Sequence, residues 1–262
     1  MAVRILVTFA LENEFAPWRA LHEFALAKLG NVDVHVADFA SSLVTVALTG
    51  VGARQAALTA PQIMRGEFDA FDCCISSGLA GGLQSNHSIG EVLAARSVFS
   101  EAVPADGTSR SIQCSGALVS FAAESGAKVV EQFYSAGHVI STAREKQVLS
   151  AKADAVEMES FEILRAAQGA GVPAVALRAI SDTLDEDLPI DMAEILTDEG
   201  RVSVPRVLGQ VALKPQSLPG LLRLGKNSRA AAQSLSRFLD AYVAALANRT
   251  APLETKLTAG AF

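Results

Sequence analysis

The chain has 262 residues and a formal net charge of -6; 50% of its residues are hydrophobic and 19% are charged. This composition excludes an intrinsically disordered protein, because such chains are poor in apolar residues and rich in charge. No uninterrupted apolar run approaches the roughly 20 residues that a membrane-spanning helix needs. Glu12 and Glu14 directly follow the first apolar run, which argues against a secretory signal peptide.

Short apolar runs alternate with helical patterns through the first 180 residues. The expected strands are 3–10, 34–37, 43–48, 72–76, 92–98, 137–141 and 174–180, and the expected helices are 16–29, 53–65 and 156–167. Pro61 is expected to kink or break the second helix. After a segment rich in proline and glycine, the apolar residues between 235 and 246 follow a helical stripe. The alternation predicts a largely parallel sheet with helices on both faces.

The three cysteines, Cys73, Cys74 and Cys114, lack the spacing of metal ligands, and the adjacent pair cannot easily form a disulfide. We expect them to be small buried hydrophobes in a reduced, cytoplasmic protein.

Charge is unevenly distributed along the chain. Residues 201–249 contain one acid, Asp240, and eight basic residues: Arg201, Arg206, Lys214, Arg223, Lys226, Arg229, Arg237 and Arg249. This segment is therefore +7 and the remainder is -13, since the total is -6. Such a split suits a surface for an anionic partner. A nucleic-acid partner is disfavoured because the segment lacks interleaved aromatic residues that stack on bases.

Ligands of parallel α/β sheets bind beyond the carboxyl ends of the strands. Glu12 and Glu14 follow the first strand, where they either favour a helix N-terminus or serve as a general base or sugar-hydroxyl acceptor. The glycine-rich segment 77–82 is either a tight turn or a place where the backbone approaches a ligand. Its spacing fits neither a dinucleotide fingerprint nor a P-loop.

Two further motifs carry charge near expected strand and helix ends. Glu157 and Glu159 stand at the start of an expected helix, where paired acids suit the helix dipole. Arg178 and Asp182 lie at the end of the last strand, which places a cation close to a potential general acid. The alternative for this second pair is a structural salt bridge.

Five motifs stand in register along the chain: ALENE at 10–14, GVG at 50–52, SGLAGG at 77–82 with GE at 90–91, VEME at 156–159 and RAISD at 178–182. Together they resemble the nucleoside phosphorylase and methylthioadenosine/S-adenosylhomocysteine nucleosidase superfamily over about residues 3–185. The resemblance implies a three-layer α/β/α, nucleoside phosphorylase-like fold with a mixed central sheet, plus a C-terminal helical extension. It also implies cleavage of an N-glycosidic bond without a metal or an organic cofactor.

The resemblance assigns roles to individual residues. Asp182 would protonate or hydrogen-bond the departing purine, Glu14 would orient an attacking water, and Arg178 would face the nucleophile, whether phosphate or water. The implied substrate-binding residues are Gly78, Ile140, Met158, Glu159 and Ser181, with Met158 and Glu159 on the ribose. The implied nucleophile or phosphate site comprises Arg178, Ser77 and Leu79.

The sequence departs from the family pattern at two places. Leu79 stands where the nucleosidases carry Ser or Thr, so Ser76 or Ser77 would have to supply the missing oxygen. The segment 139–146 (VISTAREK) lacks the Asp and the stacking aromatic of the family's base-binding loop. Phe133 and Tyr134, slightly upstream, are the candidates to stack on the base.

Later motifs resemble the hopanoid-associated branch of the superfamily: SDTLDEDLP at 181–189, GR at 200–201 and KPQSLPGLLRL at 214–224. This resemblance implies a phosphorylase that releases adenine from adenosylhopane, with inorganic phosphate as co-substrate. The alternatives are a hydrolytic methylthioadenosine/S-adenosylhomocysteine nucleosidase and a non-catalytic purine-nucleoside sensor.

These observations predict a catalytic domain over residues 1–200, a basic, leucine-rich helical extension over 201–250 and a flexible tail over 251–262. Leucines at 218, 221, 222 and 224 among basic residues suit a peripheral contact with the inner face of a membrane. The alternative is that these leucines cover the core or a subunit interface. A homo-oligomer is expected.

Overall fold

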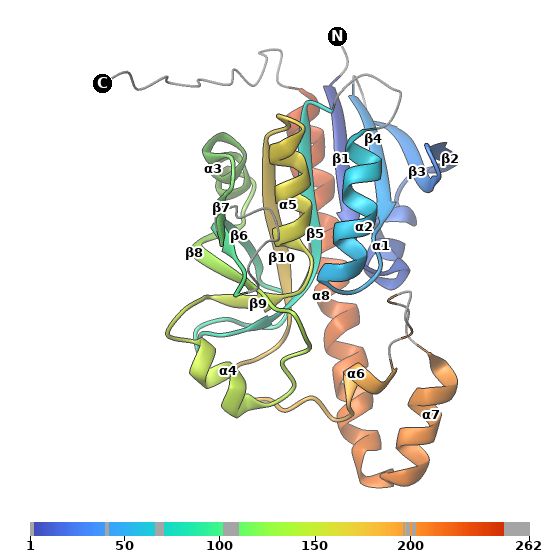
Figure 1. The fold of residues 1–262 in the computed structure, drawn as a ribbon, viewed down its shortest axis with the longest axis vertical. Helices are drawn as coiled ribbons and strands as arrows, with labels where there is room; N and C mark the ends of the chain where they lie inside the picture. Colours follow the sequence, from blue (N-terminus) through green and yellow to red (C-terminus); the bar gives the residue numbers. More distant parts are fainter. Residues whose placement is uncertain are drawn as a thin grey trace.

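The structure, a computed structural model, describes residues 3–39, 42–65, 71–101, 110–195, 197, 200 and 203–248. Arg201, Arg249 and the expected tail at 251–262 lie outside the described residues. The three-layer α/β/α architecture with a mixed sheet and a C-terminal helix is confirmed (Figure 1).

One ten-stranded sheet forms the middle layer, and its longest strand, β5, lies at the centre. Its strands are β1 (Val3–Phe9), β2 (Ala25–Leu29), β3 (Val32–Phe39), β4 (Ser42–Leu48), β5 (Cys73–Gly82), β6 (Val92–Phe99), β7 (Ser111–Gln113), β8 (Lys128–Ser135), β9 (Ala155–Glu157) and β10 (Ala174–Asp182). Strand β1 runs parallel to β4 and β5, whereas β3 runs antiparallel to β2 and β4.

Strand β5 pairs with three strands: β1, β10 and, at its last two residues, β9. From β10 the pairing continues through β6 and β8 to β9, and so returns to β5. This ring of strands brings the carboxyl ends of β5, β9 and β10 to one place beside the end of β1. The functional residues gather there.

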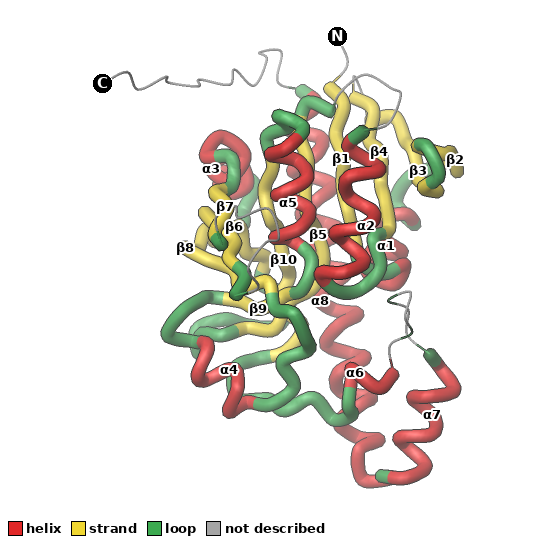
Figure 2. Tube along the Cα trace, viewed as in Figure 1, coloured by secondary structure: helices red, strands yellow, loops and turns green. Residues whose placement is uncertain are grey.

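Two layers of helices cover the sheet (Figure 2). The helices are α1 (Glu12–Arg19), α2 (Ala53–Met64), α3 (Gly116–Glu124), α4 (Ala143–Leu149), α5 (Ser160–Gly169), α6 (Met192–Ile195), α7 (Val204–Leu213) and α8 (Leu218–Ala247), with a 3-10 turn at Pro215–Ser217. Helices α2 and α5 lie on one face, and α1 and α8 lie together on the other. Helix α2 continues past Pro61, so this proline does not break it.

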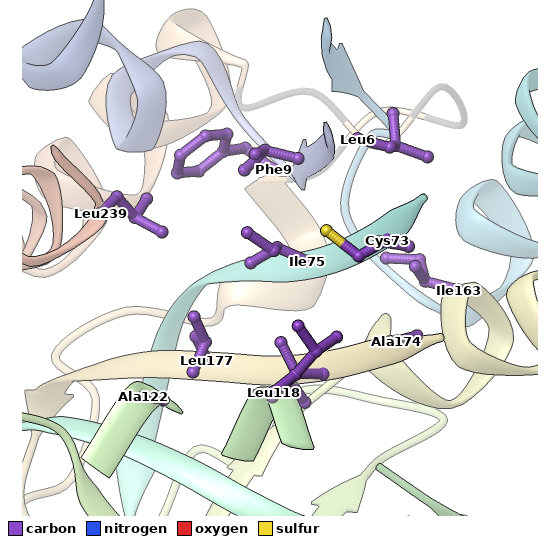
Figure 3. Packing of buried hydrophobic residues seen from close by; sticks show 14 of the residues in the cluster. Leu6, Phe9, Cys73, Ile75, Leu118, Ala122, Ile163, Ala174, Leu177 and Leu239 are labelled. Carbon is purple, nitrogen blue, oxygen red and sulfur yellow. The ribbon is translucent and has the colours of Figure 1, made fainter. Parts of the chain in front are cut away.

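The core is built from the apolar faces of these layers. Figure 3 shows side chains of β1, β5 and β10 packed among those of α3, α5 and α8. Cys73, Cys74 and Cys114 are free and buried, and burial raises the pKa of Cys73 to about 12 and that of Cys114 to about 11. Their thiols therefore stay protonated and act as core packing.

Several expected elements were wrong. Residues 16–29 do not form one helix: α1 ends at Arg19, and residues 25–29 form β2, which pairs with β3. The expected loop 77–82 is the end of β5, and the expected start of the helix at 156 is β9, so α5 begins only at Ser160. Residues 137–141 form no strand, while β8 was not expected. Strand pairing overrides local periodicity at β2, which pairs with the next strand, β3, and at the end of β5, which pairs with the distant β9.

Helix α8 has two different halves. Its buried residues all lie between Ala231 and Ala247, in the core beside β10, whereas none of residues 218–230 is buried. With α7, this first half extends beyond the sheet (Figure 1). The expected domain boundary at residue 200 stays a prediction. The second half of α8 nevertheless packs into the same hydrophobic core as the sheet. No helix among the described residues is long and apolar enough to cross a membrane.

Candidate active site

A cavity of about 220 Å³ lies where β1, β5, β9 and β10 end. Its lining includes four carboxyl groups, those of Glu14, Glu157, Glu159 and Asp182. Among the described residues that line it there is no lysine and no arginine. The other lining residues are Ala10, Leu11, Val51, Leu79, Ala80, Gly81, His138, Val139, Ile140, Val156, Met158, Ser181, Leu188, Leu224 and Ser228. The cavity is therefore rich in acids, and its other lining residues are mostly apolar.

Glu14 is held in place by backbone donors. Its Oε2 accepts hydrogen bonds from the N–H groups of Ala10 (3.0 Å) and Leu11 (3.1 Å), and its Oε1 accepts one from Leu79 N–H (3.1 Å). Burial raises the pKa of Glu14, although these hydrogen bonds and Arg178 oppose the shift. A carboxyl with a raised pKa and a fixed orientation suits a general base near neutral pH.

Two glycines of β5 make room for the catalytic candidates. A Cβ at Gly78 would lie 3.3 Å from Glu14 Oε1, and Gly78 has a φ of +152°. A Cβ at Gly81 would lie 2.9 Å from Asp182 Oδ2, closer than side-chain carbons approach. The glycine-rich segment thus allows two carboxyl groups to approach the backbone of one strand.

Glu159 caps the start of α5 and reaches toward α2. Its Oε1 accepts a hydrogen bond from Gly52 N–H at 2.7 Å. Burial, followed by the charge of Glu157, raises the pKa of Glu159 to about 8, while Arg178 opposes this shift. In the unliganded protein Glu159 therefore keeps its proton at neutral pH. A positive charge developing nearby would favour its ionised form.

Arg178, which the resemblance implies at the nucleophile, is held in a cluster of buried side chains. Its side chain is 1% exposed and does not line the cavity. One guanidinium nitrogen, Nη2, lies 2.6 Å from Glu157 Oε2 and 2.8 Å from Ser160 Oγ, and the other, Nη1, donates to the Ser76 carbonyl at 2.9 Å. A buried cation needs a compensating anion and full hydrogen bonding, and Glu157 supplies the charge.

Asp182 ends β10 and is bound through both oxygens. Ser181 Oγ donates to Oδ1 at 2.8 Å, and Lys146 Nζ donates to Oδ2 at 2.5 Å. Lys146 is fully buried and was not among the residues expected at the site. Nothing in the sequence singles it out beyond its place in the segment 139–146, because a lysine in a helix is ordinarily exposed.

The other expected residues divide into two groups. Leu79, Ile140, Met158 and Ser181 line the cavity, whereas Gly78 and Ser77 do not. Ser77 Oγ is buried without a hydrogen-bond partner. Ser76, the other serine considered as a replacement oxygen, donates to or accepts from Ser160 Oγ at 2.9 Å and so belongs to the Arg178 cluster.

Neither expected stacking aromatic reaches the cavity. Phe133 is fully buried in the core, and the Tyr134 ring stacks on Phe99 with their centroids 5.0 Å apart. His138 lines the cavity instead, beside Ile140. Sequence reasoning missed His138, Leu188, Leu224 and Ser228 because they come from loops and from α8, which only the tertiary fold brings to the strand ends.

A second, larger cavity of about 1100 Å³ lies between α1 and the projecting half of α8. It shares Leu79, Leu224 and Ser228 with the acidic cavity, so the two are adjacent. Its walls are mostly apolar and include Leu21, Ile190, Ile195, Val207 and Leu221, with Arg229 and Arg237 among its polar residues.

The fold and this site define a class: α/β/α enzymes that hold a polar ligand between carboxyl groups at the ends of the strands. The model of the phosphorylase superfamily matches residues 4–203. The chain therefore belongs to the phosphorylase superfamily. No curated protein sequence matches it.

Solved structures share the fold. The 5'-methylthioadenosine/S-adenosylhomocysteine nucleosidase of Helicobacter pylori aligns with a TM-score of 0.71 and 22% identity, over 92% of this chain and 98% of that one. The native futalosine hydrolase of Helicobacter pylori gives the same TM-score and identity over 93% and 98%. The nucleosidase from Neisseria meningitidis, solved with methylthio-immucillin-A, gives a TM-score of 0.69 and 22% identity over 92% and 99%.

Proposed function

We propose that the protein cleaves the N-glycosidic bond of a purine nucleoside. The observation that carries the proposal is the pair of buried carboxyl groups, Glu14 and Asp182, placed over Gly78 and Gly81 of one strand. Both groups line one cavity, so a sugar bound there can meet a carboxyl group on the side of the base and another on the side of the nucleophile.

Each residue then has one task. Asp182 hydrogen-bonds the base and gives its carboxyl proton to a base nitrogen as the C1'–N bond breaks and its electron pair moves to the base. Glu159 accepts hydrogen from the ribose hydroxyls and, once ionised, stabilises the positive charge that develops on the sugar; Met158 packs against the sugar. Glu14 takes a proton from the water whose oxygen forms the new bond to C1'.

Water is the nucleophile that the cavity favours. A phosphate ion carries up to two negative charges, and the described lining offers four acids with no lysine or arginine. The similar solved structures are also those of nucleosidases and a hydrolase. Phosphorolysis, with inorganic phosphate as co-substrate, is the second candidate, and the match to the phosphorylase superfamily favours it. That the reaction needs no metal or organic cofactor stays a prediction.

The larger adjacent cavity supports a nucleoside with a bulky apolar substituent, and we propose adenosylhopane in hopanoid biosynthesis as that substrate. An adenine ribonucleoside bound in the acidic cavity could extend its 5' substituent past Leu79 and Leu224 into the apolar space. Small thioether nucleosides such as methylthioadenosine would leave this space empty.

A lipid-linked substrate calls for contact with a membrane surface. Five large apolar side chains on α7 and the start of α8 are exposed: Val204, Leu208, Leu213, Leu218 and Leu222. Arg206, Lys214 and Arg223 lie exposed among them, which suits an anionic leaflet. We infer a cytoplasmic protein bound peripherally at the inner membrane face, consistent with its three free, buried cysteines. A homo-oligomer also stays a prediction.

The test is incubation of the protein with adenosylhopane and with methylthioadenosine in parallel, each with and without phosphate. Free adenine and the sugar product are measured by mass spectrometry. A hydrolase releases the free sugar in phosphate-free buffer, whereas a phosphorylase releases the 1-phosphate and needs phosphate. Nucleoside binding without adenine release under any condition would contradict the enzyme and favour a sensor.

A further inference from the structure

Among the described residues, Lys146 is the one lysine that belongs to the largest fully buried side chains. Its ammonium makes three hydrogen bonds, to Asp182 Oδ2 (2.5 Å), the Thr183 carbonyl (2.9 Å) and the Glu186 carbonyl (2.9 Å). An ammonium has three N–H donors, so all of them are used. Burying a lysine is costly unless it is paired, and this pairing is complete.

The position of Lys146 is fixed from both sides. Helix α4, which carries it, starts with a capping box in which Thr142 Oγ1 accepts from Glu145 N–H and Glu145 Oε2 accepts from Thr142 N–H. Ala143 N–H also donates to Asp187 Oδ1 at 2.7 Å. Helix α4 is thus tied to the turn after β10 by contacts that do not involve Lys146.

Lys146 does not line the cavity, whereas Asp182 does. The ammonium therefore holds the carboxyl group from behind, and Ser181 Oγ holds its other oxygen at 2.8 Å. Gly81 leaves the space for the bound oxygen, because a Cβ there would lie 2.9 Å from Oδ2. The carboxyl group has one fixed direction in the cavity.

We infer that Lys146 is a positioning residue for the base-binding carboxyl group of Asp182, an inference that rests on the proposed function. The ammonium and the Ser181 hydroxyl each hold one oxygen of this carboxyl group, so they fix the direction in which Asp182 meets a purine nitrogen and passes a proton to it as the base leaves. The effect falls on bond cleavage more than on substrate binding.

The experiment compares the K146M variant with wild type and with K152M. Lys152 pairs with Glu101 at 2.9 Å and is 52% exposed, so K152M makes the same chemical change at the surface. We expect K146M to lower kcat for adenine release by on the order of 100-fold, with KM changed less than about threefold. K152M should match wild type. A folded K146M that keeps more than half of kcat would overturn the inference.

Two further variants separate positioning from packing. K146R retains a buried cation and should recover at least about tenfold of the loss; equal rates for folded K146M and K146R would attribute the loss to packing and overturn the inference. In a D182N background, K146M should cost little more, since no ionisable carboxyl remains. Full adenine release by D182N would instead refute the role proposed for Asp182, whatever K146M does. If K146M does not fold, the test rests on K146R alone. A rate of adenine release by K146R as low as that of D182N would then overturn the inference.

Discussion

Two regions of the molecule invert the usual distribution of side chains. At the ends of β5, β9 and β10, the carboxyl groups of Glu14, Glu157, Glu159 and Asp182 are buried. On α7 and the first half of α8, five large apolar side chains are exposed by 44–83%. Buried charge and exposed apolar surface both cost free energy, so each is informative where it persists.

The difference between the two regions lies in how the cost is offset. The buried acids are held by backbone N–H groups, by Arg178 and by Lys146, all within the folded chain. The exposed apolar groups have no such partner among the described residues, and a membrane surface is the occupant that we propose. The first region is therefore a preorganised site. For the second, we propose that contact with an external surface offsets the cost of exposing apolar side chains.

The largest effect is expected at the acidic site. D182N should reduce adenine release by about 10²- to 10⁴-fold, because it removes the group that shares a proton with the leaving base. Its melting temperature should fall, because an amide has one accepting oxygen where the carboxylate has two, and the buried Lys146 ammonium loses its counter-ion. The measurement is a single-turnover assay of free adenine at high enzyme concentration.

The two halves of α8 should differ strongly in their contribution to stability. L239A removes a fully buried side chain and should lower the free energy of unfolding by about 2–5 kcal/mol. L222A, the same change at a site that is 67% exposed, should change it by less than about 0.5 kcal/mol. Denaturant unfolding measures both, and equal costs would show that α8 packs differently from the structure described.

The stability of the unliganded protein should fall as the pH rises from about 4.5 to about 8. Glu159 keeps its proton up to about pH 8 in the folded chain, whereas an unfolded glutamate loses it near 4.5. The folded state then binds more protons in this window, so stability decreases with pH. The raised pKa of Glu14 acts in the same direction.

E159Q removes the titrating group and should flatten this pH dependence. The measurement is the melting temperature between pH 5 and 8.5, with E23Q at an exposed position as the control. An E159Q protein with the same slope as wild type would contradict the assignment of the raised pKa to Glu159.

The smallest effect on folding and on soluble substrates is expected from the exposed apolar surface. The variant L213S/L218S/L222S should cleave methylthioadenosine within about twofold of wild type, yet lose binding to vesicles that contain phosphatidylglycerol. The matched control is L26S/L58S/V148S, which changes three comparably exposed apolar residues elsewhere. Vesicle co-sedimentation measures binding, and equal binding by both triple variants would remove the membrane role.

Much of the fold could be predicted because its signals are local. The apolar runs of β1, β4 and β10 and the stripe of residues 235–246 are consequences of burial on a fixed period. Residues 77–82 were misassigned because their strand character depends on β9 and β10, which lie far away in sequence. Residues 25–29 were misassigned because pairing with the next strand, β3, overrides their helical pattern.

The acidic residues of the candidate site could be predicted from the sequence, but the residues that pair with them could not. Glu14, Glu159 and Asp182 were identified from motifs at strand ends, and the structure brings all three to one cavity. Arg178 stands in the expected motif, but its charge is taken by Glu157, which motif spacing cannot reveal.

The sequence by itself determined the alternation of strands and helices, the family and the acids of the site, because periodicity and short motifs encode them locally. Only the tertiary structure decided that Lys146 holds Asp182, that Arg178 is buried and paired with Glu157, and that α8 supplies both core and cavity wall. The buried ion pairs join residues that are far apart along the chain: Arg178 and Glu157 are 21 positions apart, and Lys146 and Asp182 are 36 positions apart. Such distances are fixed by the packing of the whole sheet, not by any segment of the chain.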